Sequence, residues 1–172
     1  AFMSSDETMK NLLNEVYEMA IRKKEKNKKL PKGEKLAEIV RIRLGTRLPA
    51  YLPQRITDEF TAILKDFKDR ASKIGIKQFV IQTHFESPME ITPEAETGIK
   101  KLIEAGWIIT NQLVFTAAAS RRGHSAQLRK VLNEVGVLPY YTFTVKGYME
   151  NNSSFTPNAR LVQEELEEKA LG

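Results

Sequence analysis

Polar side chains stand at or near the ends of four otherwise apolar stretches, residues 38–47, 77–85, 107–115 and 138–147. These side chains are Arg43, Arg47, Gln82, His84, Asn111, Gln112, Thr144 and Lys146. Guanidinium groups bind carboxylates, and imidazole and amide groups form hydrogen bonds with hydroxyls. One such group at one stretch would mean little, but four stretches ending in this way indicate a pocket for a polar organic ligand.

The four stretches alternate with segments that have helical spacing. Apolar residues recur every three or four positions over residues 5–29, where Ser4 and Glu7 have capping-box spacing. Further helices are expected after Thr57, after Thr92, around residues 128–135 and over residues 158–170. Strands that alternate with helices predict an α/β fold with parallel strands and right-handed crossovers. A chain of 172 residues suits a single domain, residues 1–172.

In such folds, functional side chains gather at the C-terminal ends of the strands. Residues two apart in a strand share a face, so Gln82 and His84 are expected to project together. In the last strand, the same rule puts the hydrogen-bonding groups on one face, which we expect to line a ligand cavity. These groups are Tyr140, Thr142, Thr144 and Lys146, and Tyr141, Phe143 and Val145 would point the other way.

The composition excludes several classes of site. The chain has no cysteine, so these residues hold no disulfide, thiolate nucleophile, cysteine-ligated zinc or iron–sulfur cluster. No apolar run approaches the roughly 18 residues that a membrane span needs, and no signal-peptide pattern is present. We therefore expect a cytoplasmic protein with no membrane partner.

The net charge of +5 comes largely from the basic segment, residues 22–35. A basic cluster can bind nucleic acid, but this one has no interleaved aromatic residues. Lysines also suit the negative end of a helix dipole. The favoured interpretation is a solvated helix end without a nucleic-acid partner.

Standard catalytic motifs are absent from the sequence. There is no dinucleotide-binding glycine fingerprint, phosphate loop, paired-histidine zinc helix or nucleophile elbow. With only His84 and His124, a serine or cysteine triad is not supported. We expect His124, in "RRGHS", to be solvated at the surface. For His84, a ligand-binding role competes with that of a hydrogen-bonded residue at a strand end.

Four segments resemble the lysine 2,3-aminomutase family of radical S-adenosylmethionine enzymes in order and approximate spacing. They are "RLGTRLPAYLPQRITDEF", "THFESPMEITPE", "NQLVF" and "PYYTFTVKG". The resemblance runs from Ser4 to about Lys169. It implies a partial (β/α)6 barrel that holds a [4Fe–4S] cluster, S-adenosylmethionine and pyridoxal phosphate. In that family, a 5′-deoxyadenosyl radical derived from S-adenosylmethionine initiates migration of an amino group between neighbouring carbons.

The resemblance also implies that parts of the enzyme lie outside this chain. The family's cluster cysteines lie upstream, and the lysine that binds pyridoxal phosphate covalently lies downstream. The chain would then be the C-terminal half of the barrel, inactive without its missing N-terminal half. The exposed edges of a half barrel could also pair with another copy to form a homo-oligomer.

Carried over by position, the resemblance implies roles for individual residues. Arg47, His84 and Gln112 match family residues near S-adenosylmethionine, and Tyr140 matches a tyrosine beside pyridoxal phosphate. Gln82 has no assigned family role and is expected to support the ligand-binding residues.

One departure from the family bears on the substrate. Where the lysine enzymes have an aspartate that pairs with the distal ammonium of the substrate, this chain has Lys146. A lysine repels an ammonium and attracts a carboxylate, so we expect an acidic substrate such as glutamate. The alternative is a surface lysine beside Gly147.

Two other functions compete with an aminomutase. One is a non-catalytic module that kept half of the fold to bind a ligand. The other, which the sequence supports less, is a nucleic-acid-binding domain that uses the basic segment.

Overall fold

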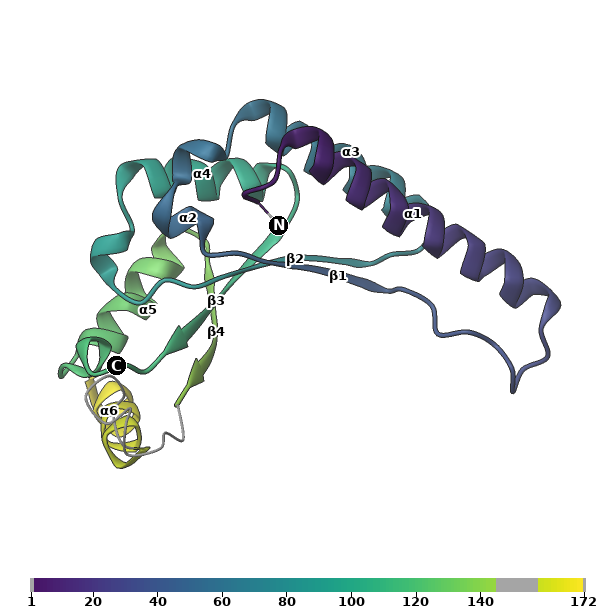
Figure 1. Ribbon diagram of the computed structural model, residues 1–172. Coiled ribbons are helices and arrows are strands. Elements are labelled where there is room, and N and C mark those ends of the chain that lie inside the picture. The colour runs from purple at the N-terminus through teal and green to yellow at the C-terminus, as the bar shows by residue number, and fades with distance from the viewer. Residues whose placement is uncertain (1, 145–157, 172) are drawn as a thin grey trace.

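The computed structural model describes residues 2–144 and 158–171 (Figure 1). The helices and strands alternate along this part of the chain, as the sequence pattern predicts. In order they are α1 (Asp6–Lys29), β1 (Arg41–Gly45), α2 (Leu48–Tyr51), α3 (Asp58–Lys73), β2 (Gln78–Thr83), α4 (Pro93–Glu104), β3 (Ile108–Val114), α5 (His124–Glu134), β4 (Leu138–Phe143) and α6 (Asn158–Leu171). Short 3₁₀ helices span Pro53–Arg55, Pro88–Glu90 and Ala118–Ser120.

The four strands form one sheet in the order β1-β2-β3-β4, and all neighbouring strands are parallel. Spatial order therefore follows chain order, as in a sheet that curves toward a barrel. This confirms the predicted α/β fold, and the arrangement is that of half a barrel.

The helix starts follow side-chain capping signals in the sequence. Thr57 accepts a hydrogen bond from the backbone of Phe60 at the start of α3, and Thr92 does the same for Ala95 in α4. The predicted cap of α1 is wrong by one residue. Its N-cap is Ser5 rather than Ser4, because the Ser5 hydroxyl is the group that reaches a free backbone N–H of the first turn.

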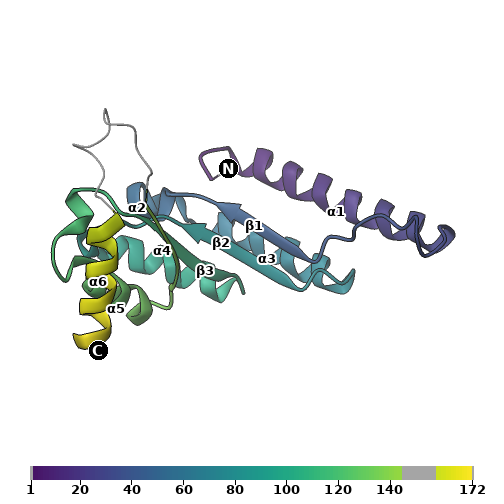
Figure 2. The same ribbon diagram turned by 90° about the horizontal axis from the view of Figure 1, so that it is seen from below.

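One face of the sheet packs against helices. Figures 1 and 2 show α3, α4 and α5 along this face. An aromatic cluster of Phe67, Phe79 and Trp107 joins α3 to the sheet, and the Trp107 indole donates to the carbonyl oxygen of Leu64. Burying such large side chains is the main driving force for this packing.

The opposite face of the sheet carries polar side chains and is much less buried. In β1, Ile42 and Leu44 pack against the core, whereas Arg41 and Arg43 project from the opposite face and are exposed. This is the alternation that a strand with one buried face shows. We call this second side of the sheet the open face.

Helix α1 extends along α3 and ends in the basic segment. Its last turn holds Lys26, Lys28 and Lys29, all exposed, as expected for a solvated helix end. Asn27 is instead buried, and its amide bonds both the N–H and the carbonyl oxygen of Leu36. These bonds hold the returning chain against α1.

Within the described residues, we find no helix that is both long and apolar enough to cross a membrane.

Candidate functional site

A cavity of about 380 Å³ lies at the C-terminal ends of β1, β2 and β3. Parallel strands bring these ends to the same edge of the sheet. The lining residues are Arg43, Gly45, Thr46, Arg47, Gln82, Thr83, His84 and Gln112. We call this the strand-end cavity. It brings together three residues that the sequence predicted as ligand-binding, namely Arg47, His84 and Gln112, and its volume is in the usual range for small-molecule sites.

Arg47 follows β1 and is held by three contacts with the protein. Its Nε donates to the carbonyl oxygen of His84 at 3.2 Å, and a terminal nitrogen lies 3.5 Å from a carboxylate oxygen of Glu90. The guanidinium also stacks over the Tyr51 ring, 4.3 Å from its centroid. Arg47 therefore links the end of β1 to the loop after β2.

His84 lies just beyond the end of β2, half-buried in the cavity wall. Burial lowers the pKa of its imidazole below the usual value, and the Arg47 charge lowers it further, against the opposing effect of Glu86 and Glu90. The ring is therefore neutral at pH 7. Its Nε2 is buried and lies 3.0 Å from Oε1 of Glu86.

Asn111 holds the backbone on which His84 is carried. Its Nδ2 donates to the carbonyl oxygen of Phe85 at 3.1 Å, and its Oδ1 accepts from the Phe85 N–H at 2.7 Å and from the Thr83 hydroxyl at 3.1 Å. Asn111 is only 3% exposed. Because these bonds fix the residues on both sides of His84, Asn111 sets the direction in which the imidazole projects.

Gln82 and Gln112 form a pair across β2 and β3. The Gln82 amide donates to the Gln112 side-chain oxygen at 2.5 Å, and both side chains line the cavity. The bond leaves the Gln112 amide nitrogen and the Gln82 oxygen available to a ligand. Gln82 therefore has the position expected of a residue that supports Gln112.

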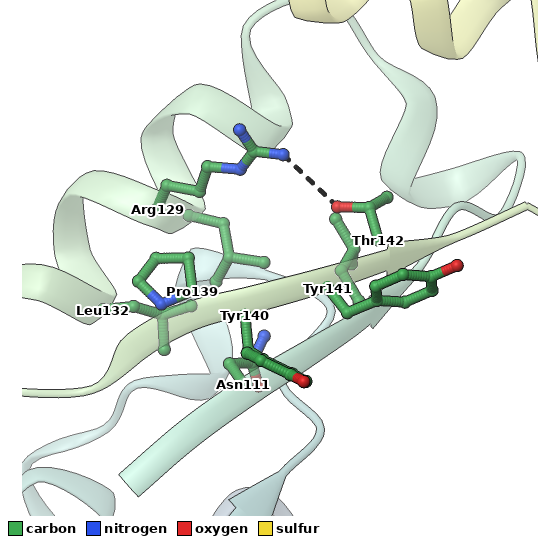
Figure 3. A pocket seen from close by; sticks show the side chains of 9 residues that line it. Asn111, Arg129, Leu132, Pro139, Tyr140, Tyr141 and Thr142 are labelled. Atoms are coloured by element: carbon green, nitrogen blue, oxygen red, sulfur yellow. Dashed lines mark hydrogen bonds between the residues drawn. The ribbon is translucent and has the colours of Figure 1, made fainter.

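Among the described residues, β4 contributes none to the lining of this cavity, although we predicted one pocket at all four strand ends. Tyr140 and Thr142 line a separate cavity of about 180 Å³ between α5 and β4. Figure 3 shows Arg129 of α5 reaching the Thr142 hydroxyl, at 3.3 Å. Lys146 lies outside the described residues.

A register shift explains this difference. The pairing of β3 with β4 moves by one residue between Asn111 and Gln112, so Gln112 lies opposite Tyr141 and Val114 opposite Phe143. Tyr141 and Phe143 share a face, as predicted, but the prediction that the face of Thr142 lines the cavity is wrong. Tyr141 and Phe143, rather than Thr142, lie on the open face with Gln112. The bulge residue is Tyr140, which is 63% exposed.

His124 is not the solvated surface residue that we expected. It begins α5, is half-buried, and its Nε2 is 2.9 Å from the carbonyl oxygen of Glu86. The His124 ring points toward the loop that follows His84, because its hydrogen-bond partner, the Glu86 carbonyl oxygen, belongs to that loop. His124 thus helps to hold that loop.

The strand-end cavity does not resemble a metal centre. The described residues hold no cluster of three or more histidine, cysteine, aspartate or glutamate side chains that could bind a metal ion. The whole chain has no cysteine. What the cavity offers is two guanidiniums, a neutral imidazole and two amides, which suit hydroxyl groups and an anionic group on an organic ligand.

Comparison with known proteins identifies the family. No family model matches the chain. An uncharacterized KamA family protein of Methanocaldococcus jannaschii is 38% identical over 170 residues, which is 99% of this chain. The chain belongs to the KamA family. A glutamate 2,3-aminomutase of Clostridioides difficile is 35% identical over 126 residues, or 71% of this chain, and an L-lysine 2,3-aminomutase of Methanococcus maripaludis is 34% identical over 103 residues, or 59%.

The chain spans about a quarter of the length of these relatives. It covers 23% of the M. jannaschii protein, 28% of the glutamate enzyme and 22% of the lysine enzyme.

Three residues that support the strand-end cavity are not predicted for these roles from the sequence. Asn111 was noted only as a polar strand-end residue, and Glu86 and Glu90 were not noted at all. Their roles depend on contacts across strands or loops. Both glutamates stand in "THFESPMEITPE". However, the contact of Glu90 with Arg47 and that of Glu86 with His84 can be seen only in the folded structure.

Proposed function

We propose that this chain forms part of a radical S-adenosylmethionine, pyridoxal-phosphate-dependent amino acid 2,3-aminomutase. The observation that carries the proposal is the strand-end cavity, where Arg47, His84 and Gln112 converge from three strands. Homology to glutamate and lysine 2,3-aminomutases supports the same reaction class.

The cavity fits part of S-adenosylmethionine. The imidazole of His84 and the side-chain amides of Gln82 and Gln112 line the cavity and can hold the ribose hydroxyls. A guanidinium in the lining suits the carboxylate of the amino acid portion. When bound, the cofactor supplies the radical that begins the rearrangement, and the residues of this chain orient it.

The [4Fe–4S] cluster does not fit this chain, because none of its 172 residues is cysteine. We propose that the cluster ligands belong to another part of the protein and that the chain alone is inactive. Tyr140 is the residue of this chain that we assign to pyridoxal phosphate. Its ring is exposed, so a cofactor could pack against it.

The substrate that we propose is an acidic amino acid, with glutamate as the first candidate. The argument rests on Lys146, whose ammonium would attract the distal carboxylate of glutamate and repel the distal ammonium of lysine. The relatives include enzymes named for each of these substrates, so homology alone does not separate them.

An anaerobic product assay tests this function. The full-length protein would be supplied with iron, sulfide, S-adenosylmethionine and pyridoxal phosphate, and then with glutamate or lysine. We expect β-glutamate and no β-lysine. β-Lysine alone would keep the aminomutase and overturn the acidic substrate. No product from either substrate, with the cluster formed, would instead favour a non-catalytic ligand-binding relative.

The same assay tests Lys146. We expect Lys146→Asp to shift the ratio of kcat/KM values toward lysine by about tenfold or more, because like charges placed together cost several kcal/mol. Lys130→Asp, an exposed residue of α5, is a control for the charge change. An unchanged preference in Lys146→Asp would contradict the assignment.

A further inference from the structure

Two arginines line the strand-end cavity, and they have different surroundings. Arg47 is engaged with the His84 carbonyl oxygen, the Glu90 carboxylate and the Tyr51 ring. Arg43 lies on the open face of β1 and is exposed. Within the part of the chain that the structure describes, its guanidinium makes no hydrogen bond or ion pair.

The position of Arg43 directs it to the cavity rather than to the rest of the sheet. Arg43 pairs with Val80 of β2, which offers no polar side chain, and it stands two residues before Gly45 on the same face. A Cβ at Gly45 would meet no atom within 4 Å, so the space beyond Arg43 along the strand is open. The guanidinium thus borders free volume.

The charge of the cavity favours an anion. Its lining contains two arginines, a neutral histidine and no aspartate or glutamate. The one carboxylate that the structure places at Arg47 is Glu90, which lies outside the lining. A guanidinium without a protein carboxylate is a strong binding group for a carboxylate or a phosphate, which it can hold through two parallel hydrogen bonds.

We propose that Arg43 binds the anionic group of the cavity's ligand, whereas Arg47 is a positioning residue that holds the loop carrying His84. This inference rests on the proposed function, whose cofactors offer two sources of such a group. One is the carboxylate of S-adenosylmethionine, and the other is the phosphate of pyridoxal phosphate.

Binding measurements on the full-length protein test the proposal without need of activity. The variants are Arg43→Gln and Arg43→Lys. The matched control is Arg41→Gln, because Arg41 lies on the same face of the same strand but bonds Gln78 and does not line the cavity. The probes are two pairs that differ in the anionic group: S-adenosylmethionine with its decarboxylated form, and pyridoxal phosphate with pyridoxal.

We expect Arg43→Gln to weaken the binding of one anionic probe by about tenfold or more, because the variant loses charge-assisted hydrogen bonds to the anion. Its uncharged or decarboxylated counterpart should bind the variant and the wild type alike. Arg43→Lys should retain part of the affinity, and Arg41→Gln all of it. The probe that is weakened identifies the source of the anion.

Two results would overturn the proposal. In the first, Arg43→Gln binds every probe with wild-type affinity. In the second, the variant loses the same amount of affinity for both members of a pair, which would indicate a merely structural role for Arg43. Failure of the wild type to bind either cofactor would overturn the proposed function itself, and with it the inference. The two failures are therefore distinguishable.

Discussion

At the scale of single residues, the site depends on groups that hold His84 rather than on His84 alone. Asn111 bonds both backbone groups of Phe85, Arg47 bonds the His84 carbonyl oxygen, and His124 bonds that of Glu86. Two strand ends and one helix start thus restrain a segment of three residues. Such support is what keeps a ligand-binding side chain in a productive position.

Replacing Asn111 by alanine should destabilise the protein and loosen the site. The backbone N–H and carbonyl of Phe85, which is fully buried, would lose their partners. We expect a loss of about 2–4 kcal/mol in the free energy of unfolding, and weaker ligand binding in the protein that remains folded.

Urea unfolding and S-adenosylmethionine binding measure the two effects. Asn133→Ala is the control, because this exposed residue of α5 should change the free energy of unfolding by no more than about 0.5 kcal/mol. Equal effects of the two substitutions would show that the Asn111 bonds have no special importance.

Which residues line the cavity could be predicted in part from the sequence, but the hydrogen bonds between them could not. Arg47, His84 and Gln112 stand out because each follows an apolar run, and parallel strands must bring such ends together. The bond between Gln82 and Gln112 depends instead on the lateral register of β2 and β3. Register is a property of the folded sheet, and no single strand specifies it.

At the scale of elements, α6 supplies a cap that α5 lacks. The N-cap residue of α5 is Gly123, which has no side chain to offer. The buried carboxylate of Glu164 instead accepts hydrogen bonds from the Ser125 hydroxyl, the Gly123 backbone and Arg160. A carboxylate at a helix N-terminus also interacts favourably with the helix dipole. One side chain thus joins the two helices.

This carboxylate makes the contact between α5 and α6 depend on pH. Burial raises the pKa of Glu164, but the bonds from Arg160 and Ser125 outweigh it, so the pKa lies below its usual value. A depressed pKa contributes stability above the unfolded-state pKa of about 4.3, and that stability is lost as pH falls through the folded-state pKa.

Glu164→Gln should therefore lower the free energy of unfolding at pH 7 by about 1–3 kcal/mol and reduce the loss of stability between pH 5 and more acidic solution. Urea unfolding across this pH range measures both quantities. Glu165→Gln removes the same charge from the next residue and should behave as the wild type. If the free energy of unfolding of Glu164→Gln depends on pH as that of the wild type does, Glu164 is not the source of this dependence.

Sequence patterns predict where the helices and strands lie better than they predict on which face of the sheet each strand residue lies. The caps at Thr57 and Thr92 mark helix starts through local hydrogen bonds, so the sequence around them was sufficient. In β4, the predicted alternation of Tyr141, Thr142 and Phe143 holds, but the bulge before them decides which of these residues lie on the open face. The extra residue, Tyr140, exchanges the faces of Tyr141 and Thr142, and it arises from pairing with β3, which is distant in the chain.

At the scale of the whole molecule, the sheet is covered by helices on one side, and β1 and β4 are its edges. Gln112, Tyr141 and Arg43 lie on the open face, which would be the interior of a barrel. The proposed function requires further barrel elements to enclose this face, and S-adenosylmethionine would lie between them and the strand-end cavity.

Gly45 provides the most direct test of that cavity. It lines the space, its backbone conformation does not require glycine, and an added side chain would meet no protein atom within 4 Å of its Cβ. Leucine at this position would therefore fill the cavity while leaving the strand intact. Gly33→Leu is a matched control, because Gly33 is equally open but lies in the turn after α1.

The decisive measurement is the affinity of S-adenosylmethionine for the full-length protein carrying Gly45→Leu. Competition for the same volume costs about 1–3 kcal/mol, so we expect binding to weaken by about tenfold or more, with the free energy of unfolding unchanged. Gly33→Leu should bind as the wild type does. If Gly45→Leu also binds with wild-type affinity, the strand-end cavity is not the cofactor site.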